Sequence, residues 1–301
     1  MIDAAVRTDT GRRRRRNEDA YVCEPPLFAI ADGMGGAQAG EVASRLAAAV
    51  LAETGGEERG EARVRALIEE ANRRVFRRSS EDAAAAGMGT TMTVALVDEE
   101  ASTIVLGHVG DSRAYRVRHG ELEQLTDDHS LVGELTRSGK LSREEAESHP
   151  QRSVITRAVG TEPDVDVDVE TTPFEPGDLY LLCSDGLTDM VSDREILALL
   201  EGSARLEDAA RALVDAANRG GGEDNVTVVL FRPDGAADFD EVDEDDDEDT
   251  LSGLEPVPAV TAPPPPDQAE EADTGRRLFP LLLLAVVVIA IAVLVTWGLT
   301  R

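Results

Sequence analysis

Four aspartates stand where apolar, strand-like segments meet glycine or another small residue. Asp32 lies in AIADGMGG, Asp111 in HVGDSRAY, Asp185 in LLCSDGL and Asp224 in EDNVTVVL. Carboxylates gathered at strand ends repel one another unless a cation compensates them. Oxygen ligands without histidine or cysteine suit Mg2+ or Mn2+ rather than zinc. Because an isolated Asp-Gly is also an ordinary turn, these residues alone leave both a shared metal site and separate turns open.

The segments around these aspartates alternate between strand-like and helix-like patterns. Helical periodicity favours two pairs of helices, at 41–53 with 61–79 and at 193–202 with 206–220. The helices come in pairs rather than after every strand, and short turns between strands suit antiparallel hairpins. An α+β fold is therefore expected rather than a doubly wound parallel sheet. Short apolar or β-branched runs predict strands at 27–31, 91–97, 102–109, 113–118, 179–184 and 225–231.

Composition narrows the function. The chain has 60 acidic and 30 basic side chains and a formal charge of -30, which disfavours nucleic-acid binding. Residues 232–275 hold 16 acids and one base, and their second half is rich in proline, so we expect a solvated spacer over 233–277. A docking surface for a basic partner is the alternative there. Cys23 and Cys183 lack the C-x5-R pattern of a cysteine nucleophile.

The C-terminal segment predicts a membrane anchor. Residues 278–299 are 22 uncharged and mostly apolar residues, enough for a helix to cross about 30 Å of hydrocarbon. Arg276 and Arg277 precede the span and Arg301 follows it, which favours a cytoplasmic N-terminal side. No apolar signal-like run occurs in residues 1–20. We therefore expect a single-pass protein of the cell membrane whose body, residues 1–232, lies in the cytoplasm.

Seven blocks of sequence, in order, resemble one protein family. RRRRRNEDA, FAIADGMGG, GMGTTMTVALV, VGDSRAYRVR, ITRAVG, LLCSDGLTDMV and EDNVTVVL are similar to the metal-dependent protein phosphatases of the PPM (type 2C) family, bacterial branch, over about residues 3–231. The resemblance implies a central β-sandwich of two antiparallel sheets flanked by helix pairs, in four αββα layers. It also implies hydrolysis of phosphoserine and phosphothreonine in proteins by a metal-activated water.

The resemblance further implies a binuclear Mg2+ or Mn2+ centre, with a third cation in bacterial members. Asp32 and Asp185 would be catalytic through the cations, and Arg14 would be catalytic by binding the substrate phosphate. Asp111, together with Asp185, matches the third site. Glu18 would hold the second metal directly or through water. Asp19 would lie behind Glu18, without touching the metal. The implied metal ligands are Asp32, Gly33 through its carbonyl, Asp111, Asp185 and Asp224.

Some roles stay open within this resemblance. The family's variable flap, which lies beside the active site, matches about Ser130 to Arg157. His129 and His149 are candidates there for proton transfer or substrate contact, with ordinary surface or capping histidines as the alternative. Met34 follows the Asp-Gly pair where some relatives carry histidine. Protonation of the leaving group is therefore left to water on the metal or to a flap residue.

The partners follow from the same resemblance. We expect phosphoserine and phosphothreonine proteins as substrates, a membrane Hanks-type Ser/Thr kinase as the opposing enzyme, and a monomer. A non-catalytic binding module is the alternative, and it predicts lost ligand acids. All of the matched acids are present.

Overall fold

The computed structural model describes residues 2–35, 39–53, 59–142, 145–146 and 149–233. Within these ranges no helix is both long and apolar enough to cross a membrane. The membrane helix expected over 278–299 lies outside the described residues, as does nearly all of the spacer expected over 233–277. Both remain predictions.

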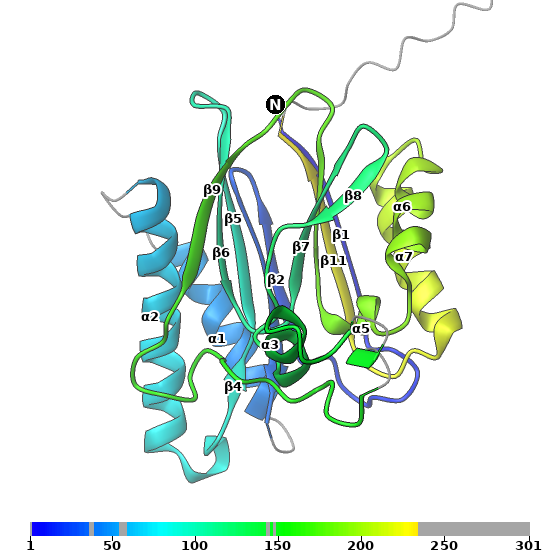
Figure 1. Ribbon diagram of the computed structural model, residues 1–301. Helices are drawn as coiled ribbons and strands as arrows, with labels where there is room; N and C mark the ends of the chain where they lie inside the picture. The colour runs from blue at the N-terminus through cyan, green and yellow to red at the C-terminus, as the bar shows by residue number, and fades with distance from the viewer. Residues whose placement is uncertain (1, 36–38, 54–58, 143–144, 147–148, 234–301) are drawn as a thin grey trace, which may run out of the picture. The chain divides into compact units, whose positions relative to one another are not determined.

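Two antiparallel sheets form the centre of the described fold (Figure 1). The first has the order β1 (Asp3–Asp9), β11 (Val226–Arg232), β10 (Leu179–Cys183), β7 (Arg113–Arg118) and β8 (Glu121–Gln124). The second has the order β2 (Asp19–Glu24), β3 (Leu27–Met34), β5 (Met92–Asp98), β6 (Thr103–Val109) and β9 (Asp168–Pro173), and β4 (Gly89–Thr90) pairs with β3.

Helix pairs cover the outer faces of the two sheets, as Figure 1 shows. Helices α1 (Ala39–Glu53) and α2 (Gly60–Glu81) pack on the second sheet, and α6 (Asp193–Glu201) and α7 (Leu206–Gly220) lie beside the first. The predicted α+β fold with two antiparallel sheets and paired helices is confirmed. The short elements are η1 (Ala83–Ala85), α3 (Leu131–Arg137) and α5 (Asp185–Thr188).

Strand β11 shows how one sequence serves two layers of core. Its side chains alternate between faces, as the pleat requires. Val228 and Leu230 pack with the helices of the first sheet. Val229 and Phe231 instead pack between the sheets, where Phe231 stacks on Phe28 with ring centroids 4.2 Å apart. A strand buried on both faces reads as a continuous apolar run, which is why 225–231 was predictable.

Strand direction brings the chemistry to one end of the sandwich. In the second sheet, Ile30 pairs with Thr93 and Val109 pairs with Met92, so strands β3 and β6 finish at the same end of the sheet. In the first sheet, Cys183 at the end of β10 pairs with Val228 near the start of β11. The chain crosses between the sheets at residues 110–112, at this same end. Four segments far apart in sequence therefore deliver their aspartates to one place.

The structure adds edge strands that sequence patterns did not indicate. Strands β1, β2, β8 and β9 all lie at sheet edges, and their burial is partial. Asp185 also differs slightly from its expected place, since β10 ends at Cys183 and Asp185 is the first residue of α5.

Candidate active site

All seven residues implied as functional line a single pocket of about 460 Å³ at this end of the sandwich. Its wall also contains residues that the sequence analysis did not single out, from the segments around β3, the flap, α5 and the start of β11. The predicted residues that line it are Arg14, Glu18, Asp32, Gly33, Asp111, Asp185 and Asp224.

Neutral hydroxyl side chains hold the backbone of Asp32. The Asp32 N–H donates to Thr91 Oγ1 at 3.0 Å, and its carbonyl accepts from Thr90 Oγ1 at 2.8 Å and from the Thr91 N–H at 2.9 Å. Both threonines are buried. None of these three bonds uses the carboxylate, and Asp32 lines the pocket.

Gly33 is required by close backbone packing. A Cβ there would lie 2.1 Å from the Gly40 carbonyl oxygen and 2.6 Å from that of Glu18. The Gly33 N–H donates to the Glu18 carbonyl at 3.2 Å. This contact joins the Asp-Gly segment of β3 to the segment that carries Glu18, and it explains why a glycine follows Asp32.

Asn225 organises the segment that carries Arg14, and sequence analysis did not identify it. Its Oδ1 accepts from the Glu18 N–H at 2.8 Å, while Nδ2 donates to the carbonyls of Thr10 at 2.9 Å and Arg16 at 2.8 Å. Arg14 lies between these two carbonyls in sequence. Its Nη2 atom lies 2.5 Å from Asp224 Oδ2, so the expected phosphate-binding arginine and an expected metal ligand form an ion pair.

Asp19 ties two strands of the other sheet together beneath the pocket. Its Oδ2 accepts from Thr227 Oγ1 at 2.6 Å and from Ser184 Oγ at 3.0 Å. Ser184 directly precedes Asp185, so this buried contact helps to set where α5 begins. The expectation that Asp19 acts from behind the pocket agrees with this position.

The electrostatics of the pocket are those of crowded acids. Burial raises the pKa of Asp32 and Asp185 well above the ordinary value, and repulsion from neighbouring carboxylates adds to both shifts. Burial also raises the pKa of Asp111 to about 7, with repulsion from Asp128 as the next cause. Charged acids held this way gain from any nearby cation.

The donor set fits divalent cations in chemistry. Among the described residues, no hydrogen-bond donor reaches the buried Asp185 Oδ1, which is free to act as a ligand. The side chains do not form a complete metal site as they stand. Across the described part of the chain, no three His, Cys, Asp or Glu side chains lie close enough together to hold an ion. The carboxylates therefore share a pocket without converging on one point.

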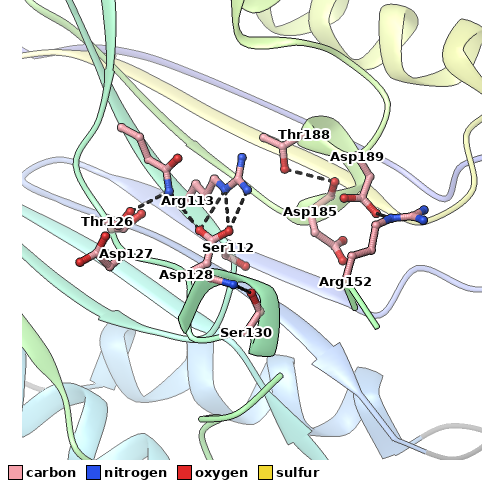
Figure 2. Close-up of polar contacts among 12 residues, drawn as sticks. Ser112, Arg113, Thr126, Asp127, Asp128, Ser130, Arg152, Asp185, Thr188 and Asp189 are labelled. Atoms are coloured by element: carbon pink, nitrogen blue, oxygen red, sulfur yellow. Dashed lines mark hydrogen bonds and ion pairs between the residues drawn. The ribbon is translucent and has the colours of Figure 1, made fainter. Parts of the chain in front are cut away.

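The flap contributes three residues to the pocket wall. Arg152, Ser153 and Ile155 line it together with Asp189, which follows α5. Figure 2 shows Arg152 reaching Asp189, and its Nε lies 3.5 Å from Asp189 Oδ2. Sequence reasoning placed the flap near the site but did not single out these residues, because nothing in their spacing marks them.

Known proteins with a similar sequence settle the family. The family model described as protein phosphatase 2C matches residues 12–219. The chain belongs to the protein phosphatase 2C family. The family predicted from the seven sequence blocks is therefore confirmed.

Individual members of the protein phosphatase 2C family resemble most of the chain. The serine/threonine phosphatase stp of Listeria monocytogenes is 41% identical over 245 residues, covering 77% of this chain and 96% of that protein. The crystal structure of Mycobacterium tuberculosis PstP/Ppp has a TM-score of 0.72 and 41% identity, covering 76% of this chain and 97% of that one. The catalytic domain of PstP in complex with two manganese ions has a TM-score of 0.70 and 39% identity, covering 76% and 97%.

In this protein phosphatase 2C, the described pocket lining contains no histidine. Met34 occupies the wall next to Gly33. Of the two histidines proposed for proton transfer or substrate contact, His129 is buried and does not line the pocket. His149 accepts a hydrogen bond from the Gln151 N–H at 3.2 Å and is also absent from it. Neither histidine therefore lines the described pocket.

Proposed function

We propose that this protein is a metal-dependent phosphatase that hydrolyses phosphoserine and phosphothreonine in proteins. One observation carries the proposal: seven residues implied by five separate motifs line one pocket of about 460 Å³. The names of the relatives, which are serine/threonine phosphatases, support the same reaction class.

The acids implied as metal ligands each have a role in this reaction. Asp32, Asp185 and Asp224 would hold two divalent cations with the Gly33 carbonyl, and Glu18 would contribute directly or through water. Asp111 would hold a third with Asp185. The cations supply the Lewis acidity that activates water and offsets charge on the phosphoryl group. The manganese in the PstP structure supports Mn2+ or Mg2+ as the natural choice.

Arg14 is suited to bind the substrate phosphate. A guanidinium presents a planar fork of donors that matches two phosphate oxygens. Its side chain is 52% exposed at the pocket, and it already holds one carboxylate oxygen of Asp224. A phosphate group offers the same kind of oxygen. Arg14 would therefore exchange Asp224 for the substrate as Asp224 engages a cation.

A metal-dependence assay tests this function. The full chain, purified in detergent, should release phosphate from a phosphothreonine peptide with Mn2+ and lose that activity in EDTA. Asp32→Asn should lose at least about a hundredfold in kcat, because the ligand's charge is removed. Asp166→Asn, outside the pocket, is the matched control. Full activity in EDTA would refute the metal mechanism.

We further propose that residues 278–299 anchor the enzyme to the cytoplasmic face of the cell membrane. The support is the uncharged span and its flanking arginines. A membrane Ser/Thr kinase would then share one surface with its opposing phosphatase, which raises their effective concentration. The full chain should sediment with lipid vesicles, and a chain ending at residue 235 should not. Equal recovery of both in the supernatant would reject the anchor.

A further inference from the structure

His129, which directly precedes the flap, has no part in the proposed chemistry, and yet both its backbone and its ring make hydrogen bonds. It is 3% exposed, and its ring lies 4.8 Å from that of His108, centroid to centroid. Such a residue could be an ordinary core histidine. Its hydrogen bonds point to something more specific.

One side of His129 holds the backbone next to Asp111. The His129 N–H donates to the Gly110 carbonyl at 2.7 Å, and the Gly110 N–H donates to His129 Nδ1 at 3.1 Å. Gly110 has a φ of 116°, and a Cβ there would lie 2.6 Å from the Thr91 side chain. His129 therefore fixes both polar backbone groups of the residue that leads into Asp111, which lines the pocket.

The other side of His129 holds the far end of the flap. Because Nδ1 accepts from Gly110, the neutral ring carries its proton on Nε2. Nε2 lies 3.0 Å from Asp168 Oδ2 and donates to it, so Arg157 Nη1, a donor that lies 3.1 Å from the same Nε2, finds its acceptor on Asp168 instead. Asp168 Oδ1 accepts from Arg157 Nη1 at 2.6 Å. One carboxylate of β9 thus joins the residue before the flap to the last residue of the flap.

Backbone hydrogen bonds close the same junction. The Thr156 N–H donates to the His129 carbonyl at 2.8 Å, and the Leu131 N–H donates to the Val154 carbonyl at 2.8 Å. Arg113 holds Asp128 from the first sheet, with Nη2 2.7 Å from Oδ2, as Figure 2 shows. The strand-to-strand crossing at 110–113 and both ends of the flap therefore meet at residues 128–129.

We propose that His129 is a positioning residue, which through Asp168 and Arg157 sets the flap residues Arg152, Ser153 and Ile155 in the wall of the pocket that Asp111 also lines. Burial lowers the pKa of His129, which keeps the ring neutral and preserves its contact with the Gly110 N–H. Only one part of the proposal rests on the phosphatase function, namely that the flap contacts the substrate. The junction itself is independent of that function.

The flap contains a built-in probe for this proposal. Lys140 is the only lysine in the sequence and is exposed directly after α3. Endoproteinase Lys-C therefore has a single target, and its rate on the full chain in detergent reports opening of the flap. Asp168→Asn and Arg157→Gln should each raise that rate about tenfold, which corresponds to about 1.4 kcal/mol.

Asp166→Asn is the matched control. The Asp166 side chain is 84% exposed, and its carboxylate comes no closer than 4.0 Å to Arg157, so the ion pair between them is weak. The cleavage rate of this variant should equal that of the wild type. A general loss of stability would also speed tryptic cleavage at the many arginines of α2 and α7. A parallel rise at those arginines, or no rise at Lys140 in either variant, would overturn the proposal.

Kinetics separate positioning from simple structural support. In Asp168→Asn, the KM for a phosphothreonine protein should rise about tenfold with kcat nearly unchanged. The KM for p-nitrophenyl phosphate should change less than about threefold, since this small ester has no peptide to meet the flap. Equal losses on both substrates would reject the role of the flap junction. If the wild type hydrolyses neither substrate, the phosphatase function fails while the Lys-C result still stands.

Discussion

Asn225 offers a sharp test of how the pocket is held together. It is 4% exposed, and its side chain makes three hydrogen bonds, one to the Glu18 N–H and two to the carbonyls of Thr10 and Arg16. Asn225→Ala removes all three and leaves their partners without replacement. Each such bond contributes about 0.5–1.5 kcal/mol net, and buried orphans push the loss upward, so we expect about 3 kcal/mol in total.

This loss can be measured in two ways. For a domain of this size, about 3 kcal/mol lowers Tm by about 6–12 °C. Arg14 also loses its anchored loop, and misplacing a binding group by about 1 Å can cost about a hundredfold in rate. Differential scanning calorimetry and kcat/KM on a phosphothreonine peptide, with Mn2+, give the two readings.

Two further variants sharpen the Asn225 test. Asn225→Asp keeps the volume and the acceptor for Glu18 but turns an oxygen toward two carbonyls, so it should be as damaging as alanine. Asn218→Ala removes a single side-chain bond, to Asp9 at 3.1 Å, and should cost about 1 kcal/mol. The reasoning is refuted if Asn225→Ala has the same Tm as Asn218→Ala and keeps the kcat/KM of the wild type.

Three more outcomes follow from the pocket's charges. Arg14→Gln should raise the KM for a phosphopeptide about ten- to a hundredfold, and an unchanged KM in steady-state assays would contradict its role. Asp185→Asn should abolish activity yet raise Tm in EDTA, because burial and the neighbouring carboxylates oppose ionisation of Asp185 and raise its pKa, and asparagine has no charge to oppose; a lower Tm would argue against crowding. Burial raises the pKa of Asp111 to about 7 and that of Asp19 to about 6, so the native state holds protons that the unfolded state releases. Their contribution to stability should therefore be lost as pH rises through about 6–7, and Tm measured in EDTA should fall less steeply for Asp111→Asn.

Much of the fold was predictable because its central strands are buried on both faces. Strand β10 has the sequence LYLLC and β11 has VTVVLFR, and such continuous apolar runs predict buried strands directly. The edge strands do not. Strand β8 reads ELEQ and β9 reads DVETTP, with half-exposed faces whose strand state depends on a partner far away in sequence. A pairing such as Thr103 with Pro173 is visible only once the sheet exists.

The site divides along a similar line. Asp32 and Gly33 were predictable because their chemistry and their backbone geometry coincide in adjacent residues. Asn225 was not, because its role depends on carbonyls about two hundred residues earlier in the chain, brought near by pairing of β1 with β11. The same holds for His129, whose histidine chemistry suggested proton transfer until burial and its hydrogen-bond partners placed it behind the pocket.

The way the acids are held explains how a fold tolerates them. Hydroxyl and amide groups hold the backbone at two of the acids: Thr91 holds that of Asp32, and Asn225 that of Glu18. These neutral contacts use donors and acceptors of the main chain and leave carboxylate oxygens such as Asp185 Oδ1 without a donor. A fold that neutralised those oxygens internally would be more stable but would have nothing left to offer a cation. Arg14 is the partial exception, since it compensates Asp224 by a contact that substrate phosphate can replace. The repulsion among the pocket carboxylates therefore favours cation binding, and the hydrogen bonds of the uncharged residues around them stabilise the fold against that repulsion.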